Sequence, residues 1–155
     1  MSIISPGIVE AQLALVVITK GIFEKAISDT AQSIYLSIYD VINFHDPKVN
    51  AILVNSDISN KIEIIEILIK DIEIKNEALN MCLEKIHDAI LHIREDLKNI
   101  KKSLEQHKEK YFKWFRHIYH QNQINSLKIH IEQFNTRMKL LIDIITVYKV
   151  DNTNI

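Results

Sequence analysis

The sequence predicts an all-α fold, an up-and-down bundle of four to five long amphipathic helices. Residues 79–104 carry an apolar side chain at every step of an unbroken alternation of four and three residues, which aligns them along one stripe of an α-helix. The 155 residues include only two glycines and two prolines, and neither type occurs from Lys48 to Ile155. Because both residue types punctuate turns, their scarcity favours a few long elements. Isoleucine is abundant and favours strands by propensity, but the helical spacing overrides that preference.

The first element is predicted to begin with Ser5 as N-cap and Pro6 at the first helical position. Residues 8–18 are almost wholly apolar, but they are fewer than the ~20 residues that span a bilayer, and Glu10 interrupts them. No basic residue precedes this run, so we expect no secretory signal. We expect the helix to be buried in the bundle, and the alternative is insertion into a membrane interface or a partner groove.

The helical pattern continues to about Phe44, and Gly21 with residues 28–30 marks a place where the helix could bend or restart. Asp46 before Pro47 then predicts a second N-cap, followed by a short helix to about Val54.

The next helix, which Ser56 or Asp57 can cap, has its own apolar stripe. Its members are Ile58, Ile62, Ile65, Ile69 and Ile72, widened by Ile64 and Leu68. The phase of this stripe reaches Leu79 without slipping, so one very long helix competes with a hairpin at Lys75 and Asn76. A compact domain gains more burial by folding back, and we therefore expect the break.

The central stripe consists of Leu79, Leu83, Ile86, Ile90, Ile93, Leu97, Ile100 and Leu104. The same phase continues through aromatic residues and predicts a helix to about His120, with a turn at residues 120–123. Residues 124–148 repeat the spacing, so two matching stripes can bury each other. We expect residues 1–150 to form one domain and residues 151–155 a frayed polar tail.

Charge is unevenly distributed. The net charge of −1 gives no bulk polyelectrolyte character, but residues 98–116 hold seven basic and two acidic residues, a local charge of +5 that leaves −6 for the rest. The single cysteine, Cys82, cannot form an intramolecular disulfide and is predicted to be a small core residue in a reducing compartment.

The sequence offers little for catalysis or metal binding. Three pairs have a helical spacing that could chelate a metal, namely Glu84 with His87, Asp88 with His92, and His117 with His120. A di-metal bundle needs a second E-x-x-H helix and further inward carboxylates, which this chain does not have. Because the phosphate-loop, nucleophile-elbow, C-x-x-C and H-E-x-x-H motifs are also missing, we expect no enzyme activity, no cofactor and no metal site.

The segment with the most functional character is 108–120, where aromatic and basic residues alternate. The candidate binding surface comprises Lys101, Lys102, Lys108, Lys110, Phe112, Lys113, Phe115 and Arg116. We expect Phe112, Phe115 and Tyr119 to pack on the first helix. Two alternatives are a basic and aromatic patch for an anionic membrane surface and a stacking and phosphate-binding patch for nucleic acid. Phosphate binding alone needs less aromatic surface, so a lipid or protein partner ranks above nucleic acid.

The order of segments resembles a known helical bundle. The run CLEKIHDAILHIREDL at residues 82–97 and the run RMKLLIDII at residues 137–145 are similar in pattern to the N-terminal four-helix bundle of mixed-lineage kinase domain-like proteins and to fungal HeLo-like domains. The resemblance covers residues 57–148 and includes no diagnostic motif. It would imply membrane permeabilisation through basic and apolar surfaces. The kinase-like domain of those proteins has no counterpart here. The segment from His107 to Arg116, together with the Ile- and Asn-rich style, also resembles uncharacterised helical proteins of large DNA viruses, a resemblance that implies no known activity.

Together these features predict a non-enzymatic helical-bundle interaction protein that self-associates or binds a helical protein partner. The alternative is a membrane-engaging bundle of the cell-death type that acts through the first helix and the basic, aromatic surface. In either case we expect a cytoplasmic, intracellular protein, attached at most peripherally to a membrane.

Overall fold

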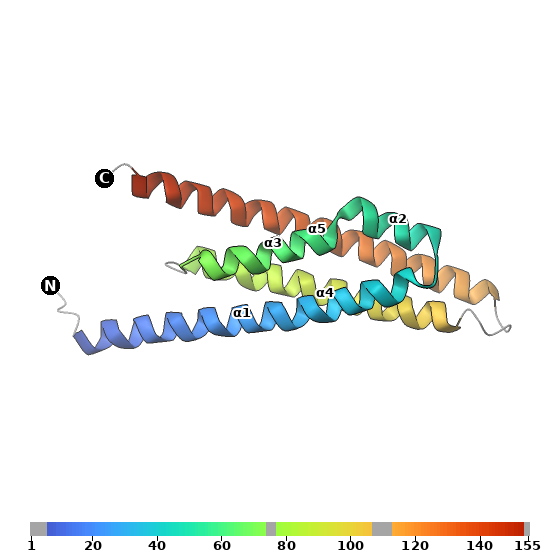
Figure 1. Ribbon diagram of the computed structural model, residues 1–155, viewed down its shortest axis with the longest axis horizontal. Helices are drawn as coiled ribbons and strands as arrows, with labels where there is room; N and C mark the ends of the chain where they lie inside the picture. Colours follow the sequence, from blue (N-terminus) through green and yellow to red (C-terminus); the bar gives the residue numbers. More distant parts are fainter. Residues whose placement is uncertain (1–5, 74–76, 107–112, 154–155) are drawn as a thin grey trace.

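The computed structural model describes the backbone of residues 6–73, 77–106 and 113–153, and within these the side chains of residues 20–73, 77–106 and 119–149. Five helices follow one another: α1 (Pro6–Ile42), α2 (Pro47–Ser56), α3 (Ile58–Asp71), α4 (Glu77–Gln106) and α5 (Lys113–Thr153). Figure 1 shows α1 and α4 running in one direction, and α2, α3 and α5 returning in the other. The predicted all-α, up-and-down bundle is therefore confirmed.

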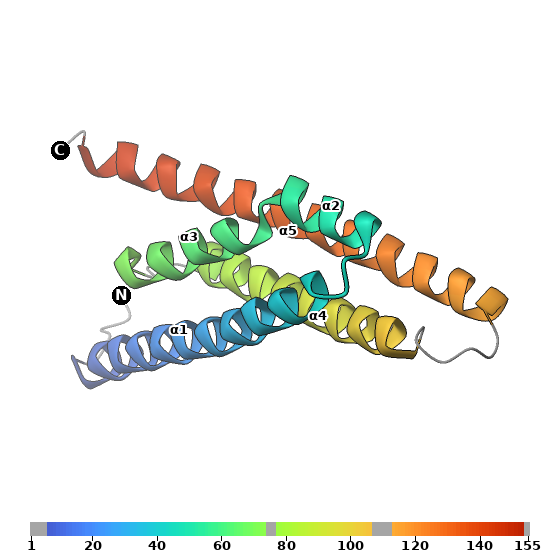
Figure 2. The same cartoon turned by 45° about the vertical axis from the view of Figure 1, so that its right-hand side comes forward.

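Helix α4 lies between α1 and α5 and makes the most extensive contacts with both of them. Helix α3 packs along α1, and α2 bridges α1 to α5, an arrangement that is clearest in Figure 2. All eight side chains of the predicted central stripe are buried, each with at most 7% of its surface exposed. Cys82, next to this stripe, is free and buried as predicted.

Helix α1 is described from Pro6 to Ile42, so it ends before the predicted limit at about Phe44. The predicted N-cap, Ser5, lies outside the described residues. It is continuous through Gly21 and residues 28–30, so no restart occurs there. Its buried face consists of Ile27, Ala31, Ile34, Ile38 and Val41. Figure 1 shows that the N-terminal part of α1 extends beyond the ends of α3 and α4.

The turn after α1 confirms the predicted cap at Asp46. The Asp46 Oδ1 atom accepts hydrogen bonds from the backbone N–H groups of Lys48 and Val49, each at 3.0 Å. These groups have no partner inside the helix, so the carboxylate fixes the start of α2. Asp57, with a left-handed φ of 52°, forms the elbow between α2 and α3. Its carboxylate accepts from the Asn60 amide at 2.7 Å and makes no side-chain cap of α3.

Helix α3 ends at Asp71, and Ile72 is extended, with φ −86° and ψ 131°. The predicted break between α3 and α4 is therefore confirmed, although Lys75 and Asn76 themselves lie outside the described residues. Of the residues that were expected to widen the α3 stripe, Ile64 is 45% exposed, so that part of the prediction is wrong. Leu68 is partly buried against the core.

The predicted turn at residues 120–123 is wrong, because these residues lie inside α5. The predicted continuation of the central helix to His120 is wrong for the same reason: α4 ends at Gln106 and residues 113–120 run back as the start of α5. A polar run without Gly or Pro does not by itself end a helix. The helical structure also reaches Thr153, three residues into the expected tail.

Within the described residues, no helix contains a stretch both long enough and apolar enough to cross a membrane.

Candidate functional site

The predicted basic and aromatic surface is described only at its α4 end. Lys101 donates to the Asp40 carboxylate of α1 at 2.8 Å, and this hydrogen bond raises the pKa of Lys101. Lys102 is exposed. Asp40 thus neutralises one of the two described lysines, which leaves less positive charge for a ligand than the sequence indicates.

The other members of this surface cannot be placed against α1. Lys108, Lys110 and Phe112 lie outside the described residues, and Lys113, Phe115 and Arg116 begin α5 with side chains outside the described set. The neighbouring Tyr119 is 48% exposed, although it was expected to pack on the first helix.

A cluster of polar side chains joins three segments at one end of the bundle. His120 on α5 lies with Nδ1 3.3 Å from the Ser103 hydroxyl on α4 and with Nε2 3.2 Å from the Asp46 carboxylate. An ionised carboxylate only accepts, so Nε2–H donates to Asp46. With that tautomer of the uncharged imidazole, Nδ1 would accept from the Ser103 hydroxyl. We call Asp46, Ser103 and His120 the end cluster.

The end cluster has the residue types of an acyl-transfer triad but not its surroundings. A nucleophilic serine must reach a substrate and needs backbone donors for the developing oxyanion. Ser103 is 3% exposed and lies inside α4, where the backbone N–H groups bond within the helix. The geometry therefore suits a polar link that fixes the α1–α2 turn against α4 and α5.

A second polar cluster lies between the middle parts of α4 and α5. Asp96, only 5% exposed, accepts from the Ser126 hydroxyl at 2.8 Å and pairs with His130 Nδ1 at 2.5 Å. The His130 ring stacks on the ring of His92, with centroids 4.8 Å apart and planes inclined by 23°. A buried carboxylate is costly unless it is hydrogen-bonded, so these contacts compensate Asp96 and fix the register of the two helices.

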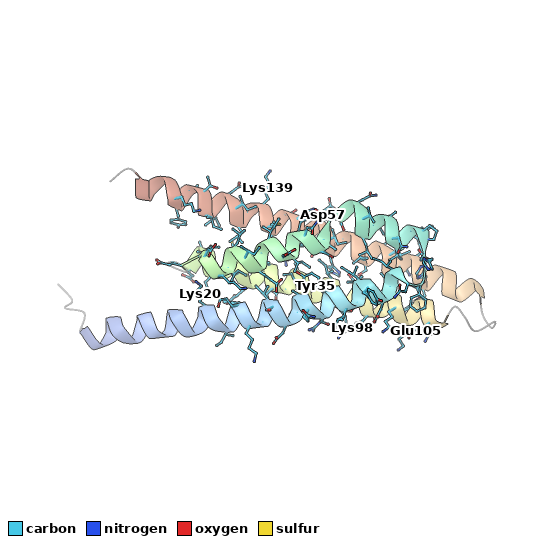
Figure 3. All side chains as sticks on the ribbon, in the orientation of Figure 1. Lys20, Tyr35, Asp57, Lys98, Glu105 and Lys139 are labelled. Carbon is cyan, nitrogen blue, oxygen red and sulfur yellow. The ribbon has the colours of Figure 1, made fainter. Side chains whose placement is uncertain are left out.

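Two further polar contacts join α1 to its neighbours. Tyr35 donates to Glu66 on α3 at 2.9 Å, and burial, the hydrogen bond and the negative charge of Glu66 raise the pKa of this phenol. Figure 3 shows Tyr35 lying between these helices. On the α4 side, His87 Nε2 is 3.5 Å from the Thr30 hydroxyl, and burial lowers the pKa of His87.

Three of the histidines that the sequence offered as metal chelators contact other groups, and the side chain of the fourth, His117, lies outside the described set. His87 contacts Thr30, His92 stacks on His130, and His120 belongs to the end cluster. Among the side chains described, no group of three or more His, Cys, Asp or Glu is arranged to hold a metal ion.

Sequence reasoning missed both polar clusters. Asp96 comes directly before the stripe residue Leu97, and Ser103 comes directly before the stripe residue Leu104. A polar residue next to the apolar stripe is the sequence feature that could have indicated a buried polar contact. That signal does not name a partner, because the partners come from other helices.

The exposed large apolar side chains gather most strongly on α5. Those described on α5 are Tyr119, Ile129, Leu140, Ile142, Val147 and Tyr148, each at least 43% exposed. On α4, by contrast, only Met81 stands among the exposed apolar residues described. A shallow hollow of about 330 Å³ lies on the exposed side of α5, lined by Ile129, Glu132, Gln133, Thr136 and Arg137. Ile129, Leu140 and Val147 lie along one line of α5 on the side away from its buried residues, so this helix carries apolar side chains on an open face as well as in the core.

Comparison of the chain with protein-family models, with curated protein sequences and with solved structures finds no match.

Proposed function

We propose that this protein is a non-enzymatic helical interaction protein, which works by self-association or by binding a helical protein partner. The single observation that carries the proposal is the row of exposed apolar residues on the open face of α5, formed by Ile129, Leu140 and Val147. A helix that only completes a bundle needs one apolar stripe, as α4 has, and an exposed apolar row on a helix is a usual feature of docking surfaces.

The polar side chains support the same proposal. Among the described side chains, three pairs of ionisable groups are used in contacts between distant segments: Asp46 with His120, Asp96 with His130, and Tyr35 with Glu66. Ser103, the one candidate nucleophile among them, is almost fully buried. Such contacts hold the helices in a fixed register and leave the outer faces for partners.

Light scattering on a size-exclusion column tests self-association. We expect the full chain to show a mass above that of a monomer at high micromolar concentration, and a mass that falls on dilution. A chain that stays strictly monomeric over this range would contradict self-association. A helical partner would then be the remaining form of the proposal.

A second candidate function, engagement of an anionic membrane surface in the cytoplasm, is favoured by one observation. The N-terminal part of α1 extends beyond α3 and α4, and its sequence PGIVEAQLALVVI contains a single charged residue. A projecting apolar helix can lie in a membrane interface, where nearby basic residues add attraction to anionic lipids.

Co-sedimentation with anionic vesicles at low salt, together with dye release, tests this candidate. We expect binding by the wild type, and its loss both in a Val16→Asp variant and on charge reversal at Lys110, Lys113 and Arg116. Absence of binding by the wild type would exclude the membrane function and leave the interaction function unaffected.

A further inference from the structure

We propose that the open face of α5 binds α5 of a second copy of this chain, with the two helices antiparallel. The inference rests on the proposed function of self-association and specifies its surface and geometry. It follows from three features of the face: its spacing, its hollow and its charges.

The spacing of the open face is that of a coiled-coil seam. Ile129, Gln133, Thr136, Leu140 and Val147 follow one another at steps of four, three, four and seven residues, and all five are exposed. Such steps keep side chains on one line of a helix. The buried residues of α5, which include Ile131, Phe134 and Leu141, lie on the opposite side. The open face is thus a second seam that no other helix of the described chain covers.

The hollow on this seam has the form of a coiled-coil hole. Four of its lining residues, Ile129, Glu132, Gln133 and Thr136, stand at positions i, i+3, i+4 and i+7. In knobs-into-holes packing, four residues at such positions accept one side chain of the facing helix. Leu140, 52% exposed, stands one turn beyond the hollow on the same seam. Each copy therefore offers both a hole and an apolar knob.

A knob and a hole on one face are what a symmetric dimer needs. Under a two-fold axis, Leu140 of each copy enters the hollow of the other, so the same contact is made twice. An antiparallel pair is the arrangement in which this exchange occurs, because the hollow of one helix then faces the position one to two turns further along the other.

Charged residues on and beside the seam fit the same axis, with Asp143 at the seam position between Leu140 and Val147. Lys128, Glu132, Lys139 and Asp143 are exposed and alternate in sign along α5. Glu132 with Lys139 and Lys128 with Asp143 have the same midpoint, between Asn135 and Thr136. A two-fold axis at that midpoint therefore places every one of these charges opposite a charge of the other sign. Figure 3 shows Lys139 pointing away from the bundle, free to reach a second copy.

Two apolar variants test the surface. Sedimentation equilibrium of the full chain should give a dimer for the wild type and, for Leu140→Glu, an affinity at least about tenfold weaker, because a charge would enter the hollow. Leu36→Glu, at a 59% exposed apolar position on α1, is the matched control and should dimerise as the wild type does. Circular dichroism verifies that each variant is folded. An oligomer that survives Leu140→Glu would overturn this inference while leaving the proposed function standing.

A charge exchange tests the orientation. Glu132→Lys alone and Lys139→Glu alone should each weaken the dimer, whereas an equimolar mixture of the two single variants should form a heterodimer in which every facing pair is again opposite in sign. A parallel pair would bring Glu132 towards Arg137 of the second copy instead. The mixture would then dimerise no more tightly than the single variants do. Single variants that dimerise like the wild type, or a mixture that stays monomeric, would overturn the antiparallel geometry. A monomeric wild type would overturn both the inference and self-association.

Discussion

The imidazole of His120 on α5 lies 3.2 Å from the carboxylate of Asp46, which is seventy-four residues earlier in the chain. The other oxygen of the same carboxylate caps α2, so one side chain fixes a local helix end and a contact between distant segments.

Replacing Asp46 should separate these two roles. Asp46→Ala removes the cap and the acceptor of His120 Nε2, and we expect it to lower the free energy of unfolding by about 2 to 3 kcal/mol. Asp46→Asn keeps an oxygen that can cap α2, so it should cost less. Urea unfolding followed by circular dichroism measures both. Equal losses in the two variants would show that the cap contributes little.

The buried imidazole of His87 should make stability depend on pH. Burial lowers the pKa of His87 from its ordinary value of 6.5, with a small opposing effect of Asp88 and a lowering effect of Arg94. Between the lowered pKa of His87 in the folded chain and its ordinary pKa in the unfolded chain, His87 binds a proton in the unfolded chain but not in the folded chain. The free energy of unfolding should therefore fall as the pH drops below 6.5, and the fall should level off below the pKa of the folded state.

Chemical unfolding of the wild type and of His87→Gln across pH 5 to 8 checks this dependence. The difference in stability between the two proteins should change with pH in the stated direction. His92→Gln is the control, because His92 is exposed. A difference that stays constant with pH would contradict a buried, neutral His87.

Burial should also make the thiol of Cys82 unreactive in the folded protein. Burial raises the pKa of the Cys82 thiol, so less of it is present as the thiolate, which is the reactive species. We expect an aromatic disulfide reagent to label the native protein slowly at pH 8 and to label one thiol at once in denaturant. Fast labelling of the native protein would mean that the core around Cys82 opens readily.

A charge in the central stripe should unfold the domain. Ile90 is completely buried, so Ile90→Asp places an unpaired carboxylate in the core, and we expect loss of cooperative thermal unfolding. Ile90→Val removes one methylene group and should cost about 1 kcal/mol. Differential scanning calorimetry compares the two, and a cooperative transition in Ile90→Asp would contradict the core assignment.

The parts of the fold that follow from local chemistry were predictable. Periodicity alone predicts the stripe from Leu79 to Leu104, and Asp46 before Pro47 predicts the start of α2. The burial gained when the chain folds back predicts the break after α3. The prediction of a turn at residues 120–123 was wrong because a polar run was interpreted as a loop. His120 is a polar residue within a helix, and its side chain makes contacts with other segments. It binds Ser103 and Asp46, which are remote in sequence.

The candidate site was less predictable than the fold. A count of basic residues identified Lys101 as part of a free positive surface, but Asp40 on α1 neutralises it. That pair depends on how two helices are aligned, which a local pattern does not contain. The open face of α5 was similarly hidden, because Gln133 and Thr136 interrupt its apolar residues and only the exposure of each side chain in the folded structure separates the two faces of this helix.

The position of α4 between α1 and α5 also determines where amide protons are kept longest. The eight residues of its central stripe are buried from Leu79 to Leu104, so its backbone hydrogen bonds can break only when both neighbouring helices leave. The amides of α4 should therefore exchange with deuterium last, at the rate of global unfolding, whereas the projecting part of α1 can exchange through local opening. The cooperative unit of this protein is accordingly the central helix and whatever touches it, and the segments that reach beyond it are the ones that can rearrange without unfolding the rest.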